Sequence, residues 1–392
     1  MRTEHDLIHL LDDEPPTPSA VDIRGAITTG RRRRRMRRAG LAGATATALA
    51  VAAVVVAGGN LFAPRPAPTA AAGPGVVPTG CGLADLPPVR SKQVTAAVVT
   101  GADPTGRYLV GRTEPVAEAV LWRDDQAQIT DLPGTGRSAF TDVNSTGTVV
   151  GWRFAKDGEP EPVPFIIQQE TVTPLPGVTH GVPLAVNNSG TVVGESGGSA
   201  VRWSSALDDA TRLPVPPGTQ RSSAVAVDQD GTVAGTVDGK AFVWLPDGTG
   251  FALPVPDIDG TAASVTTVGD IRNGWVVGSA STTGRPSGVS SAPDVLGSVS
   301  VRWNLHTGEM RLIEESRLVA SAVTADGWLV GAGAGATAPA MVAGDTTLAL
   351  PLPADSVPAV DSRYTVSDDG HTVTGLAVDA SGTRVPVVWF CI

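Results

Sequence analysis

From residue 81 onward, short apolar segments alternate with polar turns rich in glycine. Within this pattern the phrase Gly-x-Val-x-Gly recurs seven times with small variations, as in Gly147–Gly151 and Gly190–Gly194. Successive leading glycines are 41, 43, 41, 43, 53 and 43 residues apart. A regular period of this length is typical of a repeat architecture, in which each repeat is one supersecondary unit.

Each repeat divides into four expected strands, which we label a to d. Strand a ends in a polar turn such as Asn187–Gly190, where Asn and Gly allow the positive φ of a tight hairpin. Strand b is the Val-Val segment, and strand d carries a Leu-Pro phrase that suits an outer edge, because proline lacks a ladder donor. Strand c ends near an aromatic residue in five repeats: Trp122, Trp203, Trp244, Trp303 and Trp389. Repeats two and six depart from this pattern and have Phe165 and Met341-Val342 instead. Four strands per repeat predict an all-β, seven-bladed β-propeller over residues 81–392.

The two ends of this region complete one another. The seventh repeat stops after strand c at Trp389–Ile392, whereas the region begins with an orphan Leu-Pro phrase at Leu86-Pro87. We therefore expect the first strand to complete the last blade. Alignment on the fourth repeat places Cys81 and Cys391, the only cysteines, in the c–d turn that the chain break removes. This alignment predicts a Cys81–Cys391 disulfide, which an oxidising compartment permits.

The segment upstream predicts a membrane anchor. Residues 31–38 contain seven arginines, and residues 39–62 contain no charged side chain and are rich in Ala, Val and Leu. These 24 residues would extend about 36 Å as a helix, enough to span a hydrocarbon core of about 30 Å. The positive-inside rule then puts residues 1–38 in the cytoplasm and the propeller outside the cell. A cleaved signal peptide is the alternative, but its charged region is normally shorter than 38 residues.

Composition and charge agree with this division into four parts. Residues 63–80 are a linker rich in Pro and Ala, which would hold the propeller clear of the lipid. The cytoplasmic segment 1–38 is either disordered or folds on a cytoplasmic partner. The net charge is −10, yet residues 1–40 carry nine arginines against six acidic residues. The rest is strongly acidic, which argues against nucleic acid as a partner.

The repeat phrase, Asn-x-x-Gly-x-Val-Val-Gly followed by a strand ending in Trp, resembles the HAF-type repeats of bacterial extracellular proteins. The N-terminal part is similar to that of actinobacterial single-pass membrane proteins, with an Arg-rich stop before an Ala/Val helix. The resemblance implies a cell-surface propeller and supplies no functional residues.

Motifs that could carry catalysis or bind metal have simpler explanations as turns. Gly194–Gly198 matches the Gly-x-Ser-x-Gly nucleophile elbow, but it falls between two strands rather than between a strand and a helix. Acidic turns such as Asp368–Gly370 cannot alone supply the six or more oxygens that Ca²⁺ requires. Asn144 and Asn187 match the N-glycosylation pattern but are also turn residues. We therefore predict no catalytic residue, metal site or cofactor.

Departures from the repeat indicate where a ligand binds. The fifth repeat has an insertion between strands b and c, Ser279–Ser298, which includes Arg285, and the second has Trp152, Arg153 and Lys156 in the equivalent place. Loops on rigid scaffolds often carry function, although a tolerated surface insertion is the alternative.

Three functions stay open from the sequence. The first is a membrane-tethered extracellular propeller that binds a ligand or protein, with a possible sensory role through residues 1–38. The second is a cell-surface hydrolase or lyase with its site at the propeller axis, and the third is a structural envelope protein. Asp, Glu and Arg around the central channel would favour the enzyme, and small aliphatic residues would favour binding.

Overall fold

The computed structural model describes residues 75–84, 86–89, 96–123, 126–130, 132, 136–156, 158–282, 298–313, 318–333, 337–359 and 362–392. The expected cytoplasmic segment 1–38, the membrane span 39–62 and most of the linker lie outside these residues. The part of the chain that the structure describes contains no helix long and apolar enough to cross a membrane.

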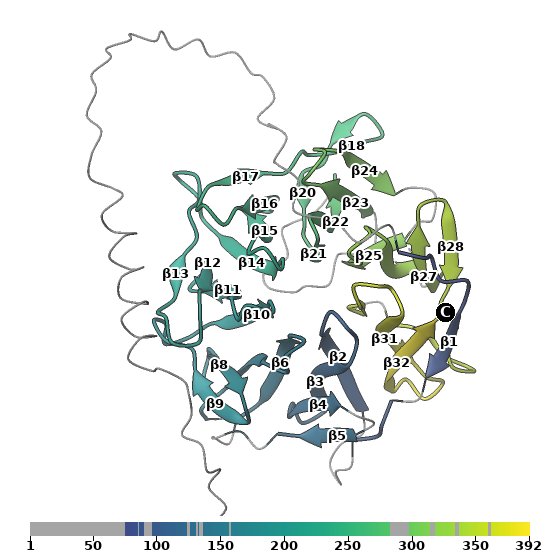
Figure 1. Cartoon of the computed structure of the whole chain (residues 1–392), viewed down its shortest axis with the longest axis horizontal. Helices are drawn as coiled ribbons and strands as arrows, with labels where there is room; N and C mark the ends of the chain where they lie inside the picture. Colours follow the sequence, from purple (N-terminus) through teal and green to yellow (C-terminus); the bar gives the residue numbers. More distant parts are fainter. Residues whose placement is uncertain are drawn as a thin grey trace, which may run out of the picture. The chain divides into compact units, whose positions relative to one another are not determined.

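Seven antiparallel sheets, one for each repeat, stand around a common axis and form the predicted β-propeller (Figure 1). We number the blades 1 to 7 along the chain, with strand a of each nearest the axis. Blade 1 contains β2 (Ala96–Ala102), β3 (Tyr108–Glu114), β4 (Ala119–Arg123) and β5 (Gln126–Ile129). Blade 2 contains β6 (Ser138–Val143), β7 (Val149–Arg153), β8 (Val163–Gln168) and β9 (Thr171–Pro174). Blade 3 contains β10 (Val182–Val186), β11 (Val192–Ser196), β12 (Ser199–Trp203) and β13 (Thr211–Arg212).

The remaining blades keep this order with two variations of strand a. Blade 4 contains β14 (Ser222–Val227), β15 (Val233–Val237), β16 (Lys240–Trp244) and β17 (Gly250–Ala252). Blade 5 has strand a in two pieces, β20 (Val265–Thr266) and β21 (Asp270–Arg272), followed by β22 (Trp275–Ser281), β23 (Val299–Asn304) and β24 (Met310–Ile313). Blade 6 contains β25 (Leu318–Val323), β26 (Leu329–Gly333), β27 (Thr337–Ala343) and β28 (Thr346–Ala349). Blade 7 also has a divided strand a, β29 (Val357–Pro358) and β30 (Thr365–Val366), followed by β31 (Thr372–Val378) and β32 (Arg384–Cys391). A further hairpin, β18 (Asp257–Ile258) with β19 (Thr261–Ala262), interrupts the connection from blade 4 to blade 5.

The ring closes as the sequence predicts. The first described strand, β1 (Cys81–Ala84), pairs with β32 as the outer strand of blade 7. Cys81 lies directly opposite Cys391 in this pairing, and the two residues form a disulfide across 310 residues of chain. The cysteines are thus on paired strands, which extend into the place that the c–d turn occupies in other blades.

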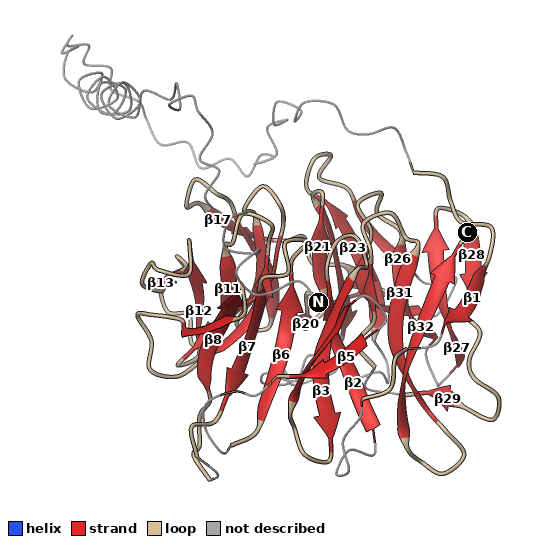
Figure 2. Cartoon of the chain, turned by 60° about the horizontal axis from the view of Figure 1, so that its bottom comes forward, coloured by secondary structure: helices blue, strands red, loops and turns tan. Residues whose placement is uncertain are grey.

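Strand order divides the propeller into two faces. Because neighbouring strands are antiparallel, the a–b and c–d connections lie on one face, which we call the turn face. The b–c and d–a connections lie on the other, the loop face. The side view in Figure 2 shows the strands running between these faces.

The two glycines of the repeat phrase have different structural roles. All seven leading glycines have positive φ, between 71° and 88°, as the turn prediction requires. The second glycine of each phrase in blades 1 to 6 lies against a carbonyl of strand a, so that a Cβ there would collide with backbone. Strand a of blades 1, 2, 3, 4 and 6 carries a β-bulge near this contact. The phrase therefore encodes a tight turn followed by a close strand approach.

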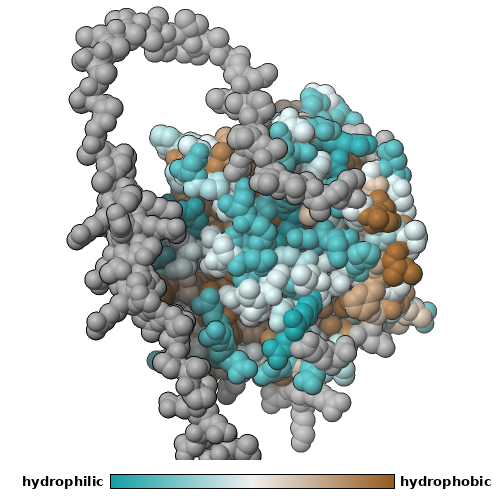
Figure 3. Space-filling model, viewed as in Figure 1, coloured by the Kyte–Doolittle hydropathy of each residue, from teal (hydrophilic) through white to brown (hydrophobic). Residues whose placement is uncertain are grey.

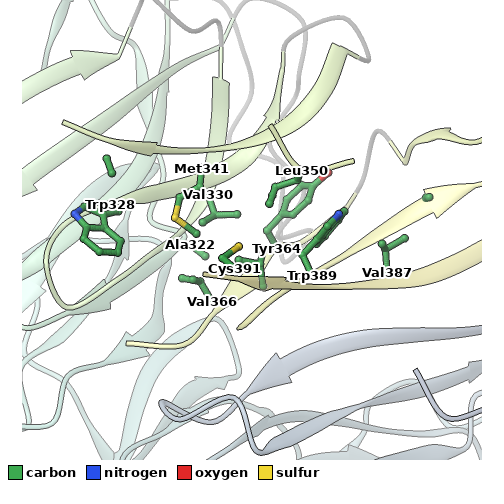
Figure 4. Packing of buried hydrophobic residues seen from close by; sticks show 13 residues of the cluster. Ala322, Trp328, Val330, Met341, Leu350, Tyr364, Val366, Val387, Trp389 and Cys391 are labelled. Atoms are coloured by element: carbon green, nitrogen blue, oxygen red, sulfur yellow. The ribbon is translucent and has the colours of Figure 1, made fainter. Parts of the chain in front are cut away.

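The Trp and Leu-Pro phrases form one structural device between neighbouring blades. In five blades the indole Nε1–H of strand c donates a hydrogen bond to the proline carbonyl of the preceding blade's Leu-Pro phrase. These bonds are Trp122–Pro87 at 3.1 Å, Trp203–Pro176 at 2.8 Å, Trp244–Pro214 at 2.6 Å, Trp303–Pro254 at 2.9 Å and Trp389–Pro351 at 2.6 Å. Figure 4 shows Trp389 beside Leu350 and Tyr364 in the core between blades 6 and 7.

The prediction that the Leu-Pro phrase lies within strand d is wrong in four blades. Leu175, Leu213, Leu253 and Leu350 follow directly after β9, β13, β17 and β28, and all four leucines are buried. The proline therefore ends the outer strand and presents its carbonyl to the tryptophan of the next blade.

Candidate functional site

Strand a of every blade contributes to a cavity at the axis. Its lining includes Thr100, Asp142, Ala185, Ala226, Asp270 and Tyr364, together with Ser321 from blade 6. The cavity has a volume of about 40 Å³, which is room for a few molecules the size of water. A sugar ring or a peptide does not fit into it.

Charged residues gather at this axis, and the sequence did not predict that they would come together there. The Nε atom of Arg272 lies 3.7 Å from Oδ2 of Asp270 and 3.7 Å from Oδ1 of Asp368, a residue of the blade 7 turn. Arg363 donates a hydrogen bond from Nη2 to the carbonyl of Gly269 at 3.2 Å. The axis thus has the small residues that were expected to favour binding and also the charged residues that were expected to favour an enzyme. Its composition therefore does not distinguish the two functions.

Burial perturbs the titration of the cluster. Loss of hydration raises the pKa of the Asp142 carboxyl to about 6, against the opposing attraction of Arg272. Burial likewise raises the pKa of Asp368 to about 6 and raises that of Asp270. Burial alone would lower the pKa of Arg272, but the combined attraction of nearby carboxylates, led by Asp270 and Asp368, is larger and raises it.

The a–b turns next to the cluster are linked to one another by hydrogen bonds. Asn144 donates from Nδ2 to the carbonyl of Asn187 at 2.9 Å, and Asn187 donates in the same way to Asp228 at 3.0 Å. Backbone bonds continue this pattern from Ala325 to Asp368 and from Asp368 to Pro104. Asn144 and Asn187 are each 1% exposed, so they are structural turn residues rather than sites for a glycan.

The motifs that could have indicated catalysis or metal binding are explained by turns and hairpins in the described residues. Ser196 ends β11 in a hairpin with β12, and its hydroxyl donates to the carbonyl of His180 at 2.6 Å. It is therefore not a nucleophile elbow. Among the described residues, no group of three or more His, Cys, Asp or Glu side chains is arranged to hold a metal ion.

On the loop face, the structure places three of the four candidate binding residues. Trp152 is the penultimate residue of β7, and its ring lies edge-to-face against Phe154, at 5.6 Å between centroids. Arg153 is half-buried beside them, and Lys156 is exposed. Arg285 lies outside the described residues. Phe154, which the sequence analysis did not single out, completes an aromatic pair on this loop.

The loop face also bears an apolar groove at the closing seam between blades 7 and 1, which we call the seam groove. It has a volume of about 460 Å³, and Leu83, Pro87, Ala97, Trp122 and Pro386 contribute to its lining. Its position on the loop face follows from the strands, because Ala97 is near the start of β2 and Pro386 near the start of β32.

An ion cluster borders the groove. Glu114 lies directly opposite Ala96, a residue of the groove lining, and its Oε1 is 3.2 Å from Nη1 of Arg384 and 3.5 Å from Nη2 of Arg112. Two guanidinium groups therefore flank one carboxylate on this side of the groove.

Apolar side chains are exposed at the same seam. Leu83 and Phe390, from the two strands that close the ring, are 46% and 56% exposed. In Figure 3, apolar residues gather at the edge of the propeller over β28 and β1, while polar residues cover its middle.

Comparison with known proteins identifies the fold alone. No protein-family profile matches the sequence, and no curated protein matches it. A catalytically inactive variant of virginiamycin B lyase from Staphylococcus aureus with quinupristin is similar in structure, with a TM-score of 0.53 and 12% identity over 80% of this chain and 100% of the lyase. YCF48 bound to D1 peptide has a TM-score of 0.44 and 14% identity over 81% of this chain and 99% of that one. Porphyromonas gingivalis dipeptidyl peptidase 4 has a TM-score of 0.44 and 10% identity over 75% of this chain and 53% of that one. The seven blades, together with the likeness to the lyase, define the class as a seven-bladed β-propeller, and this fold does not by itself imply a function.

Proposed function

We propose that the chain is a membrane-tethered extracellular propeller that binds a protein partner on its loop face. The proposed anchor is residues 39–62, with residues 1–38 in the cytoplasm, and its support is the apolar run behind seven arginines. The resemblance to HAF-type repeats of bacterial surface proteins supports the same location, and the disulfide is compatible with an oxidising compartment.

The path of the chain into the propeller favours the loop face for binding. Gly75 donates its backbone N–H to Oδ2 of Asp326, a residue of the blade 6 a–b turn, and Ile392 exchanges backbone hydrogen bonds with Thr79 and Gly80. The chain therefore reaches the propeller along the turn face. A tether attached there leaves the loop face directed away from its point of attachment.

The observation that carries the proposal is the difference in volume between the axial cavity and the seam groove. The axial cavity of about 40 Å³ is too small for a substrate, whereas the seam groove of about 460 Å³ lies within the range of roughly 300–1,000 Å³ typical of ligand sites. The groove is lined by aliphatic, proline and tryptophan side chains, so we infer a partner that inserts an apolar side chain. The guanidinium groups of Arg112 and Arg384 beside the groove favour an acidic group next to that side chain.

Site-specific photo-crosslinking in cells that express the full chain tests this proposal. A photo-reactive amino acid at Leu83 in the groove or at Lys156 on the loop face should give discrete protein adducts. Leu207, which is 87% exposed in the β12–β13 connection on the turn face, is the control position and should give none. Equal labelling at all three positions, or no adduct at any of them, would contradict a binding role for the loop face.

The enzyme remains an alternative proposal, with Asp142, Asp270 and Arg272 as its candidate groups. Its weakness is the lack of room around these side chains, because the cavity they border has a volume of only about 40 Å³. Asp142 and Asp270 also accept backbone hydrogen bonds within the fold. A structural envelope protein is the third proposal, and a failure to form adducts at any position would favour it.

A further inference from the structure

Seven equivalent positions surround the axis, one in each blade. At each position, a residue of strand a pairs with the residue of strand b that precedes the second glycine of the repeat phrase. The positions are Gly101, Asp142, Ala185, Ala226, Asp270, Ala322 and Thr365. Five of the seven are uncharged and small, so the two aspartates depart from what the geometry favours.

Both aspartates make the same contact between blades. Asp142 accepts a hydrogen bond at Oδ2 from the backbone N–H of Val186 in blade 3, at 2.8 Å. Asp270 accepts one at Oδ2 from Val323 in blade 6, at 3.4 Å. In each case the donor is the residue that follows the equivalent position of the next blade, so each carboxyl group joins two blades at the axis.

Other charged groups face these carboxyls from across the axis. Arg272 forms ion pairs with Asp270 and Asp368, and the charges of Asp142 and Asp228 also act on it. Arg363 acts on Asp270, while Asp369 acts on Asp368. The residues that β2, β10, β14 and β25 contribute to the cavity lining are all uncharged: Thr100, Gly101, Ala102, Leu184, Ala185, Val225, Ala226, Val227 and Ser321.

Negative charge therefore exceeds positive charge in a confined space. The carboxyls of Asp142, Asp228, Asp270 and Asp368 outnumber the guanidinium groups of Arg272 and Arg363. Burial disfavours the ionised form of a carboxyl, and repulsion between neighbouring carboxylates acts in the same direction. A proton is the ligand that such a site accepts without any change in the volume of the cavity.

We propose that the axial cluster is a proton-binding latch, which takes up protons in mildly acidic medium and thereby stabilises the closed ring. Asp142 is its principal group, because none of the basic side chains that the structure describes lies as close to it as Arg272 lies to Asp270. On protonation its carbonyl oxygen still accepts from Val186, so the contact between blades 2 and 3 is kept while the buried charge is removed.

The sign of the pH effect follows from the direction of the shift. The pKa of Asp142 rises from 3.8 to about 6 on folding, so the folded chain holds a proton that the unfolded chain releases. Stability is therefore reduced above pH 6 and recovers as the pH falls through about 6 toward 4. Asp368 acts in the same direction, with a smaller effect because its side chain is 36% exposed.

Urea unfolding of the full chain in detergent micelles at pH 7.5 and pH 5.0 tests the latch. The variant Asp142→Asn keeps an oxygen acceptor for Val186 but cannot take up the proton. Between the two pH values, the wild-type unfolding constant should fall by about tenfold more than that of this variant. The matched control Asp209→Asn removes an exposed carboxyl and should retain the wild-type dependence. Equal pH dependence of Asp142→Asn and wild type would overturn the proposal.

A second measurement applies if the variant does not fold. Unfolding of the wild-type chain in weakly buffered solution at pH 6 should release about half a proton per chain from Asp142 and a smaller amount from Asp368. No release, or net uptake, would overturn the latch.

Discussion

Replacement of both Cys81 and Cys391 by alanine tests how far the closing seam supports the whole ring. Alanine is preferable to serine, because Cys391 is only 2% exposed and a hydroxyl would be buried there among apolar side chains. The bond spans 310 residues, and the loop-entropy relation gives a ceiling of about 6 kcal/mol for a loop of this length.

The expected loss is smaller than this ceiling for a structural reason. Without the bond, β1 still pairs with β32 over four residues, and the indole of Trp122 still donates to Pro87. The ring can therefore close without the covalent link. We expect the double variant to lose about 2–5 kcal/mol of unfolding free energy, which is the usual range for a native disulfide.

Equilibrium unfolding in urea, followed by circular dichroism on the full chain in detergent, measures this loss. Wild type in excess reductant should approach the stability of the double variant, and the variant itself should not respond to reductant. A loss below about 1 kcal/mol would refute the reasoning, since the strand pairing alone would then suffice to close the ring.

Two further substitutions and one truncation test other parts of the account. Trp203→Phe removes the bond to Pro176 together with some buried ring area, and should cost about 1–3 kcal/mol in the same unfolding assay; an unchanged midpoint would show that the indole bond is dispensable. Asn187→Ala removes the acceptor for its own turn and the donor to Asp228, and should cost about 2–3 kcal/mol, whereas a neutral effect would contradict the linked turn ring. Deletion of residues 39–62 should move the chain from the membrane fraction to the soluble fraction after cell lysis, and retention in the membrane would contradict the proposed anchor.

The fold was predictable because its determinants are local and repeated. The turn glycine and the crowded second glycine recur in every blade, so their spacing reveals the number of blades. The closing strand was also predictable, since the orphan Leu86-Pro87 phrase matched the strand missing after Trp389. The hydrogen bond between the Trp and Leu-Pro phrases was not predicted, because a single repeat does not show that its tryptophan contacts the blade before it.

The axial cluster was missed for a different reason. Asp142 and Asp270 are 128 residues apart in the chain, and only the strand pairing reveals that they occupy equivalent positions. A charged residue in an otherwise apolar strand a was the one available signal. The seam groove was equally inaccessible, because Leu83 and Pro386 come from opposite ends of the propeller sequence.

The most direct test of the account is the side of the membrane on which the propeller lies. Single cysteines at Asp209, exposed in blade 3, and at Ser19, in the proposed cytoplasmic segment, can be labelled in intact cells with a membrane-impermeant maleimide. The account predicts labelling of Asp209→Cys in intact cells and of Ser19→Cys only after lysis. Labelling of Ser19→Cys in intact cells, or protection of Asp209→Cys until lysis, would contradict it.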